Sequence, residues 1–548
     1  MIPTVAFLAL GCAQQGMPSG GPKDVTPPRM LHATPPSGVT RFTGDEFYIE
    51  FDEYVQVKDA ENRIIVSPPM KKRPEYATKG HGVRVRIKDT LQPNTTYLFQ
   101  FQEAIVDFNE GNPLPVLEYV LSTGDVVDSF SLSGRVEDAY TGGVWKEPVT
   151  VALYNRVSLA DSTVAKEIPT YITRCDRQGL FHFHNVRDGA YYIVAFEDGD
   201  KDMRLGAEAA AWCDTMVFAE YVPPSDTAVD TILAVSAKPG IVLRISSNAK
   251  EKQRVKSANG MQRKGYAEVV TMLPMKKPVV KGLSSNIKWV ANATMDTLKV
   301  WTLPPLDTLW VALFDSTGID DTLKLRYNSN MASALNNKRG KDGNTASQVR
   351  FSATSQLAYF DSLRILFPNP MEPKLALDSI VEVTDLSDSS LHLARAVLSD
   401  KGLKALVEYK FVEGKKYACF LPPHVFTDIF GVENDSVTCK FEVTDESQYG
   451  HLNLAVSTGD IVTPFLIQLL DKKDDVVQQC VVKNVGLLAF PHLLPGSYRV
   501  RAIEDRNGNG QWDGGDYWSQ RQPERTYLFE KRLEVRANWE FNEEYSIQ

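Results

Sequence analysis

The sequence has little that points to nucleic-acid binding, membrane spanning or helical structure. Its 548 residues carry 60 Lys and Arg against 69 Asp and Glu, a net charge of −9, whereas a nucleic-acid-binding protein normally presents a basic face. No apolar run approaches the roughly 20 residues that a membrane-spanning helix needs. Long amphipathic segments with helical periodicity are almost absent. With 43% hydrophobic and 24% charged residues, the composition is that of a globular protein of several domains.

Cysteine and histidine are too sparse and too scattered to form a recognisable metal or catalytic motif. The six Cys include no CxxC pair and the eight His include no HExxH pattern, and no nucleophile elbow or phosphate-binding loop is present. His182 and His184 would share one face of a strand, which is the spacing of a metal pair, but a polar strand face opposite Phe181 and Phe183 is the simpler interpretation. We therefore expect a protein without enzymatic activity. Cys419 and Cys439 flank one turn region and are placed to face each other across adjacent strands.

Strand signals are dense along the chain. Examples are E-F-Y-I-E-F (46–51), V-R-V-R-I (83–87) and L-K-V-W-T-L (298–303), which alternate apolar and polar residues between turn-forming residues. The pattern predicts an all-β protein, built as a tandem array of β-sandwich domains.

The first residues resemble the lipobox of bacterial lipoproteins. The stretch M-I-P-T-V-A-F-L-A-L-G-C is apolar and ends in a small residue, Gly11, before Cys12. In such proteins a signal peptidase cuts before the Cys, whose thiol carries a diacylglycerol. No Lys or Arg precedes the apolar run, which leaves a buried N-terminal strand as the alternative. We expect 1–11 to be the remnant of a signal peptide, Cys12 to carry a covalent lipid, and 12–28 to be a flexible Gly/Pro-rich tether.

Two further resemblances concern whole domains. Residues 25–125 resemble the bacterial Ig-like domain of the SbsA type, through A-T-P-P-S-G (33–38), F-D-E-Y-V (51–55), L-Q-P-N-T-T-Y (91–97) and V-D-F-N-E-G-N-P-L (106–114). Residues 126–237 resemble a carboxypeptidase-regulatory-like or collagen-adhesin B-type β-sandwich of the transthyretin kind, through G-L-F-H-F-H-N-V (179–186) and G-A-Y-Y-I-V-A-F-E-D (189–198). The resemblances imply that the array consists of Ig-like and transthyretin/regulatory-like sandwiches.

The same pair of domains recurs further along the chain. Gly189, Tyr191 and Asp198 align with Gly496, Tyr498 and Asp505 at one constant offset. The resulting domain plan is an Ig-like domain (29–125), a regulatory-like sandwich (126–237), a β-domain of unassigned family (238–330), a flexible loop (331–355), a second Ig-like domain (356–445) and a second regulatory-like sandwich (446–548).

The loop D-R-N-G-N-G-Q-W-D-G-G-D (505–516) is a candidate calcium site. Oxygen-bearing side chains recur as in an EF-hand-like loop, which also needs a sharp turn where Gly510 lies. The alternative is a strand-connecting turn in which Asn and Asp bond their own backbone. The equivalent stretch of the first unit, Asp198 to Asp202, has Met203 in place of the glycine, and we expect it to bind weakly or not at all. The candidate ligands are Asp505, Asn507, Asn509, Gln511, Asp513 and Asp516.

The combination of lipobox, P-S-G-G-P-K-D-x-x-P-P tether (18–28) and Ig-like domain resembles outer-membrane lipoproteins of Bacteroidota. The resemblance implies a lipid-anchored outer-membrane protein at the cell surface, acting as a scaffold or accessory subunit of an outer-membrane protein complex, including its assembly machinery, with an integral outer-membrane protein as partner. The alternative is a surface adhesin or glycan-binding module. The C-terminal aromatics Trp512, Tyr517, Trp518 and Trp539 suit a binding face, although such residues more often plug the ends of sandwiches.

Overall fold

A computed structural model describes most of the chain. The residues that it does not describe lie at the two ends and in nine internal stretches. Its first 23 residues, among them Cys12, lie outside the described residues, and so does 331–347 of the predicted loop. The described ranges are 24–155, 163–221, 240–247, 253–316, 318–327, 348–373, 377–399, 401–457, 463–483 and 486–547. Within them, no helix has the length and hydropathy needed to cross a membrane.

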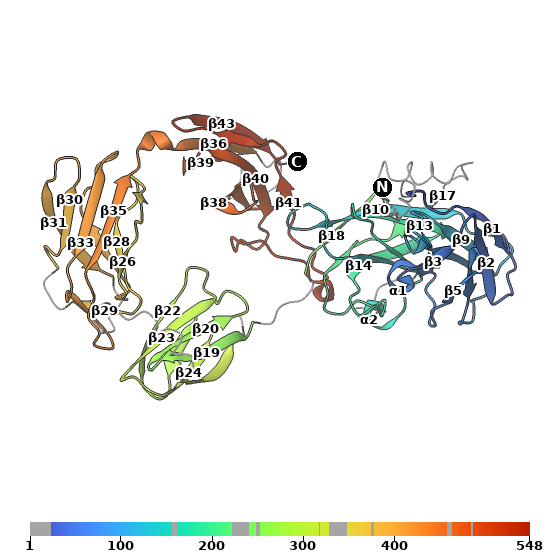
Figure 1. Cartoon of the computed structure of the whole chain (residues 1–548), viewed down its shortest axis with the longest axis horizontal. Coiled ribbons are helices and arrows are strands. Elements are labelled where there is room, and N and C mark those ends of the chain that lie inside the picture. The colour runs from blue at the N-terminus through green and yellow to red at the C-terminus, as the bar shows by residue number, and fades with distance from the viewer. Residues whose placement is uncertain are drawn as a thin grey trace, which may run out of the picture. The chain divides into compact units, whose positions relative to one another are not determined.

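The chain divides into two compact units. Unit 1 comprises 1–249 together with 512–526, and unit 2 comprises 250–511 together with 527–548. Nearly all regular structure in both units is β-strand, arranged in many small sheets (Figure 1), so the predicted all-β tandem of sandwiches is confirmed. The exact domain boundaries proposed from the sequence remain predictions.

Domain 1, at the start of unit 1, is a small sandwich. Its sheets have the orders β1-β2-β6-β5 and β4-β7-β9, and β3 pairs with β8. In β2 the alternation read from the sequence places Phe47, Ile49 and Phe51 in the core, where Phe47 stacks on Tyr119. Its elements are β1 (Met30–Thr34), β2 (Glu46–Phe51), β3 (Val55–Val57), α1 (Ala60–Arg63), β4 (Ile65–Ser67), β5 (Glu75–Lys79), β6 (Gly82–Arg86), β7 (Thr96–Gln100), β8 (Ile105–Asp107) and β9 (Glu118–Ser122).

A buried carboxylate closes the turn that follows β8. Asp107 accepts hydrogen bonds from the backbone amides of Glu110, Gly111 and Asn112 at 2.6–2.8 Å. Burial alone would raise the pKa of Asp107, but these amides lower it below its ordinary value. The V-D-F-N-E-G-N motif is therefore a structural motif whose aspartate bonds the turn.

Domain 2 is a second sandwich in unit 1. One sheet contains β13-β10-β17 with β18 parallel to β10, and the other contains β12-β11-β14-β15 with β16 on β14. Phe181 and Phe183 of β13 point into the core between them, whereas His182 and His184 are half-buried. Its elements are β10 (Phe130–Asp138), β11 (Val149–Tyr154), α2 (Thr163–Lys166), β12 (Tyr171–Arg174), β13 (Leu180–Val186), β14 (Ala190–Glu197), β15 (Ala210–Trp212), β16 (Val217–Phe218), β17 (Glu220–Tyr221) and β18 (Ile241–Ile245).

Unit 2 contains three more β-domains. Domain 3 has sheets β19-β20-β23-β22 and β21-β24-β25, and its core includes the fully buried Trp301. Domain 4 is built on one continuous sheet, β26-β28-β32-β31-β30-β33-β35-β27, with the separate pair β29-β34. Cys419 and Cys439 of domain 4 are directly opposite each other on β33 and β35, as the sequence indicated, and both are free thiols.

The strands of domain 3 are β19 (Val255–Arg263), β20 (Tyr266–Thr271), β21 (Val279–Gly282), β22 (Asn286–Ala291), β23 (Thr297–Leu303), β24 (Thr308–Phe314) and β25 (Asp320–Arg326). The strands of domain 4 are β26 (Arg350–Phe351), β27 (Gln356–Leu357), β28 (Arg364–Leu366), β29 (Met371–Pro373), β30 (Val381–Asp385), β31 (Leu391–Leu398), β32 (Lys404–Glu408), β33 (Lys416–Leu421), β34 (Phe426–Asp428) and β35 (Val437–Val443).

Domain 5 repeats the topology of domain 2. Its sheets are β39-β36-β43, in which β36 and β43 are parallel like β10 and β18, and β38-β37-β40-β41, with β42 on β40 as β16 lies on β14. The two domains therefore share a strand order as well as the motifs at one constant offset. The elements are η1 (Glu446–Gln448), β36 (Gly450–Ser457), β37 (Phe465–Leu470), β38 (Val476–Val482), β39 (Gly486–Leu493), β40 (Gly496–Glu504), β41 (Thr526–Leu528), β42 (Leu533–Val535) and β43 (Glu540–Ser546). The short helix η2 (Tyr517–Ser519) lies between β40 and β41 and belongs to unit 1.

The segment 512–526, which we call the strap, leaves the last repeat and belongs to unit 1. Tyr517 is 1% exposed and completes a hydrophobic cluster on the sheet β12-β11-β14-β15, next to Trp212, whose ring centroid lies 5.2 Å away. Trp512 packs against Tyr140. Four hydrogen bonds join the strap to domain 2: Gly515 N to Ser246 Oγ (2.8 Å), Gln522 Nε2 to Trp212 O (3.1 Å) and to Asp214 Oδ1 (2.8 Å), and Thr526 Oγ1 to Ala139 O (3.0 Å). Domain 2 is thus completed by residues that lie about 300 positions later in the sequence.

Candidate functional site

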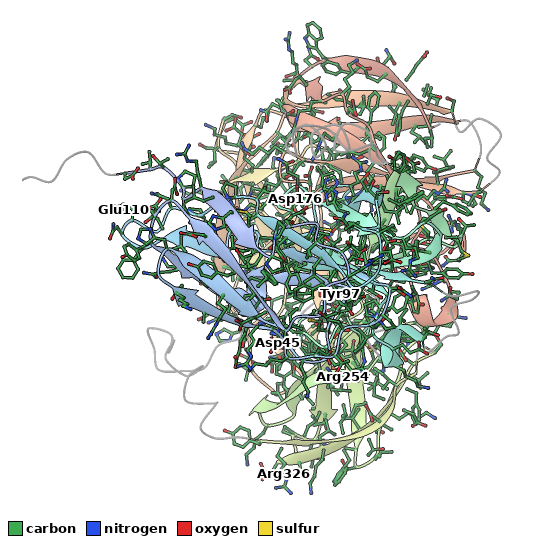
Figure 2. The ribbon with its side chains drawn as sticks, turned by 90° about the vertical axis from the view of Figure 1, so that its right-hand side faces the viewer. Asp45, Tyr97, Glu110, Asp176, Arg254 and Arg326 are labelled. Atoms are coloured by element: carbon green, nitrogen blue, oxygen red, sulfur yellow. The ribbon has the colours of Figure 1, made fainter. Side chains whose placement is uncertain are left out.

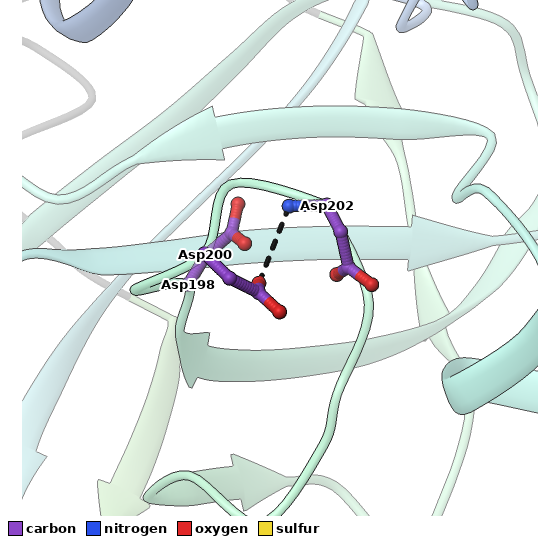
Figure 3. Close-up of side chains that lie close together, drawn as sticks. All are labelled: Asp198, Asp200 and Asp202. Atoms are coloured by element: carbon purple, nitrogen blue, oxygen red, sulfur yellow. Dashed lines mark hydrogen bonds between the residues drawn. The ribbon is translucent and has the colours of Figure 1, made fainter.

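The loop after β14 brings three carboxylates together. Asp198, Asp200 and Asp202 each offer an oxygen, and these atoms lie within 4.8 Å of one another (Figure 3). Among the residues that the structure describes, no other group of three or more His, Cys, Asp or Glu side chains converges in this way. Carboxylate oxygens at this separation are the hard ligands that calcium prefers, although calcium takes six to eight of them. The loop can therefore contribute part of a divalent-cation site.

The negative charges of this cluster repel one another when no cation is bound. Burial, followed by the neighbouring charges of Asp202 and Asp200, raises the pKa of Asp198, against the opposing effects of the Met203 amide and Arg174. Met203 adopts a left-handed backbone with φ of 61°, which costs a side-chain-bearing residue free energy. The turn that sequence reasoning reserved for glycine is therefore formed here by methionine.

The loop after β40 has the same hydrogen bonds at the equivalent positions. Gly510 N donates to Asp505 at 2.8 Å, Asn509 N to Asn507 at 3.0 Å and Gln511 N to Asn509 at 2.8 Å. In the first loop the pairs are Met203 N to Asp198 (3.3 Å), Asp202 N to Asp200 (3.4 Å) and Arg204 N to Asp202 (2.8 Å). The duplicated loops thus share one backbone design, and in both the side-chain oxygens bond the backbone as Asx turns do.

The six predicted calcium ligands are divided between the two units. Asp505, Asn507, Asn509 and Gln511 belong to unit 2, and the carboxylate of the buried Asp505 accepts two backbone amides. Asp513 and Asp516 belong to the strap in unit 1; the amide of Asp513 donates to Glu524, and Asp516 forms a backbone pair with Arg521. Calcium binding at this loop stays a prediction.

Domains 1 and 2 are joined by direct polar contacts in unit 1. The buried amide of Ile172 donates to Ser67 Oγ at 3.1 Å. Arg174 and Arg187 each donate to a main-chain carbonyl of domain 1, those of Asn62 and Asn94 respectively. Tyr97 on β7 and Asp176, which follows β12, are labelled in Figure 2; each lines a cavity that residues of both domains enclose.

A cavity of about 180 Å³ lies between these two domains. Domain 1 lines it with α1, β4 and the segment P-P-M-K-K-R-P (68–74), and domain 2 lines it with β12 and the acidic loop after β14. A second cavity of about 560 Å³ shares Pro69 and Met70 with the first and is bordered by Tyr97, Tyr171 and Tyr191. All three tyrosine hydroxyls bond main-chain groups and their rings are buried, so they offer no exposed stacking surface.

Sequence reasoning missed the first cavity because its two walls lie in different domains. Ile64 and Met70 come from one domain, and Ile172 and Arg174 from the next. The one local sign of the cavity in the sequence is the basic run Lys71 to Arg73 between prolines. Prolines make this segment rigid, but the run does not indicate which strand of the next domain it faces.

The histidine pair of β13 lines a shallow cavity with Glu118 and Asp176. The His182 and His184 rings are 6.1 Å apart, and burial, then the neighbouring His184, lowers the pKa of His182. This agrees with a half-buried polar strand face opposite Phe181 and Phe183.

The four C-terminal aromatics do not share one environment. Trp512 is half-buried and donates from Nε1 to Glu524 O at 3.0 Å, and Tyr517 is buried. Trp518 is 39% exposed and Trp539 is 55% exposed. Two of the four therefore act as packing residues of the strap in unit 1.

Comparison with known proteins supports an Ig-like domain at the start of the chain. Residues 24–123 match the model of a bacterial Ig-like domain, which confirms that resemblance. No curated protein matches the sequence. The solved structures named next share 9–11% identity with the chain. The first is the Bacillus anthracis TIE protein (10% identity, TM-score 0.13, covering 97% of this chain and 76% of that one). A second is SGBP-B of the Bacteroides ovatus mixed-linkage glucan utilization locus, in complex with a mixed-linkage heptasaccharide (9% identity, TM-score 0.18, covering 75% of this chain and 94% of that one). A third is the T6 backbone pilin of Streptococcus pyogenes (11% identity, TM-score 0.12, covering 73% of this chain and 80% of that one). The chain thus carries a bacterial Ig-like domain within an array of β-sandwiches.

Proposed function

We propose that the protein is a lipid-anchored protein of the cell envelope that acts as a non-enzymatic scaffold for an integral outer-membrane protein. A scaffold must hold its binding surfaces in a fixed relation. Consecutive domains of a chain normally move relative to each other unless their interface is extensive. The proposal therefore depends on contacts that remove this freedom.

The observation that carries the proposal is the bracing of unit 1. Domain 1 is bonded to domain 2 through the buried contact of Ile172 with Ser67, and the strap packs Tyr517 onto the opposite edge of the same domain 2. Segments from the start, the middle and the end of the sequence thus fold into one compact unit. Such cross-bracing supports a mechanical role better than a role that needs a moving active-site loop.

The anchor is proposed from the sequence alone, because Cys12 lies outside the described residues. Several acyl chains hold a protein firmly in a membrane, whereas the apolar run before Cys12 is too short to span it. Cys12→Ala should release the protein from the membrane fraction of the native host into the soluble envelope fraction. Cys480→Ala, which removes a half-buried thiol of domain 5, is the matched control and should remain membrane-bound. Equal retention of both variants would refute the anchor.

A glycan-binding surface is the second candidate, favoured by an aromatic pair at the start of β43, with Trp539 just before the strand and Phe541 on it. Trp539 is 55% exposed and its ring stacks beside that of Phe541 at 6.1 Å. Exposed aromatic faces combine a large apolar area with polar edges and suit contact with sugar rings. The test is binding of the full chain to a glycan array. The control is Trp310→Ala, which removes a different tryptophan that is 39% exposed. Binding that is lost in Trp539→Ala and kept in Trp310→Ala would favour this function over the scaffold.

A further inference from the structure

The cavity between domains 1 and 2 has the features of a ligand site rather than a packing defect. A packing defect in an apolar core is lined by apolar atoms alone, whereas ligand sites combine an apolar floor with a few convergent polar groups. This cavity has both, and it lies between two domains, which is a common place for ligand sites. Its volume of about 180 Å³ is comparable to the roughly 150 Å³ that is known to accept one benzene ring.

The floor of the cavity is apolar and held in place. Ile64, Met70 and Ile172 are each less than 10% exposed, and they come from both walls. Pro69 and Pro74 bracket the segment that carries Met70 and restrict its backbone. The cavity is therefore preformed for a small apolar group.

Three cationic side chains border this floor. Arg174 is half-buried and donates to the Asn62 carbonyl. No carboxylate of the described residues forms a direct ion pair with it, and Asp198 is the negative charge that acts on it most strongly. Lys201 donates to the Asn62 side chain, and Arg73, which is about half exposed, is 4.0 Å from Glu61 at the rim. A half-buried guanidinium that no carboxylate contacts directly has lost hydration that an incoming anion can replace.

Two carboxylates also line the cavity. Glu61 is largely exposed, and Asp198 accepts the Met203 amide of its own loop and attracts Arg174. Three cations and two carboxylates thus line the cavity, which leaves an excess of one positive charge. The edge strands β4 and β12 approach each other beside it, and each is unpaired on its outer side within its sheet. An extended main chain can run along such edges.

From this arrangement we infer that the cavity binds an apolar group that carries a carboxylate, with the apolar part between Met70 and Ile172 and the carboxylate at Arg174 and Arg73. Two sources have this chemistry: a small aryl or alkyl acid, and a polypeptide segment with a terminal or side-chain carboxylate beside an apolar residue. The site lies in unit 1 and does not depend on the anchor or on the scaffold role proposed above.

The test uses the full chain and two matched probes, 3-phenylpropionate and its neutral amide, 3-phenylpropionamide, in ligand-observed NMR and calorimetric titrations. A hydrogen bond to a charged group adds enough binding energy that the acid should bind about tenfold or more tightly than the amide. Equal affinities of acid and amide, or binding of neither, would overturn the inference.

Variants locate the binding. Arg174→Gln should weaken binding of the acid about tenfold or more and leave the amide unchanged. Arg187→Gln is the matched control, because Arg187 also donates to a main-chain carbonyl of domain 1 but does not line this cavity. Arg73→Glu keeps the fold intact, since Arg73 is exposed, and should weaken the acid through repulsion. An equal effect of the Arg174 and Arg187 variants, or no effect of Arg73→Glu, would contradict the assignment.

The source is distinguished with a tetrapeptide that ends in Phe with a free carboxylate. Affinity about tenfold above that of 3-phenylpropionate identifies a polypeptide that uses the strand edges, and equal affinity identifies a small acid. Both results support the site, whereas failure of the peptide and the free acid alike overturns it.

Discussion

The strap makes a quantitative prediction about the stability of domain 2. Replacing Tyr517 by Ala removes an aromatic ring that is 1% exposed and that covers the cluster containing Tyr154, Phe196 and Trp212. Because the strap is fixed at both sides of Tyr517 by hydrogen bonds from Gly515 and Gln522, the site has little freedom to collapse around the vacancy. Deleting a buried aromatic ring in such a setting costs about 3–5 kcal/mol.

The effect should be local, and native-state hydrogen exchange measured by mass spectrometry can detect it. Peptides that cover β11, β14 and β15 should exchange roughly a hundredfold faster or more in Tyr517→Ala, because about 1.4 kcal/mol corresponds to a factor of ten. Peptides from domain 3 should be unchanged, since they belong to unit 2. A local measure is needed because a chain of several domains does not unfold as one two-state transition.

Two control variants separate the ring from other effects. Tyr517→Phe keeps the ring and should change exchange in these peptides far less than Tyr517→Ala. Trp518→Ala removes the neighbouring aromatic, which is 39% exposed, and should have little effect. If Tyr517→Ala left exchange in β11, β14 and β15 at the wild-type rate, or if Trp518→Ala accelerated it equally, the strap would not be a structural part of domain 2.

Three further predictions concern carboxylates. Lys415, whose Nζ lies 2.6 Å from Asp385 Oδ2, lowers the pKa of Asp385 to about 2. The ionised Asp385 therefore stabilises domain 4 at pH values above the ordinary pKa near 3.8, and this stabilisation disappears as the pH falls towards 2. Asp385→Asn should therefore accelerate hydrogen exchange in β30 and β33 at pH 7 relative to wild type, with the difference shrinking towards pH 2.5; an equal difference at both values would contradict the ion pair. Burial and like charges raise the pKa of Asp198. Asp198→Asn in EDTA should therefore raise the melting temperature of unit 1 at pH 7, and the two melting temperatures should converge at pH 3. A lower melting temperature of the variant at pH 7 would be evidence against charge repulsion in the loop. Calcium titrated into the full chain should release or absorb heat that Asp505→Asn abolishes and Asp198→Asn retains; no heat and no rise in melting temperature at millimolar calcium would rule out the site at 505–516.

The fold could be predicted because its signals are local. The alternation in E-F-Y-I-E-F places Phe47, Ile49 and Phe51 in the core, and a strand needs no more than this period of two to choose its buried face. The constant offset between Asp198 and Asp505 likewise predicted a duplication, because related loops keep their turn-forming residues. The shared hydrogen bonds of the two loops agree with that duplication.

The interfaces could not be predicted, because nothing local encodes them. Tyr517 lies in a polar loop and gives no sign that its ring fills the side of a sheet formed more than 300 residues earlier. Ser67 and Ile172 are ordinary strand residues whose hydrogen bond depends on how two finished domains meet. The turn at Met203 illustrates the same limit at short range, since a left-handed backbone there was expected only of glycine.

We propose that the braced, lipid-anchored chain holds an integral outer-membrane protein. The most direct measurement is affinity purification of the full chain from the native host in a mild detergent, followed by mass spectrometry with quantification of stoichiometry, and Cys12→Ala as the control. The scaffold proposal predicts one integral outer-membrane protein in near-equimolar amount with the wild-type chain and much less of it with Cys12→Ala. Recovery of the chain without any stoichiometric membrane protein, under conditions in which it remains membrane-bound, would contradict the proposal.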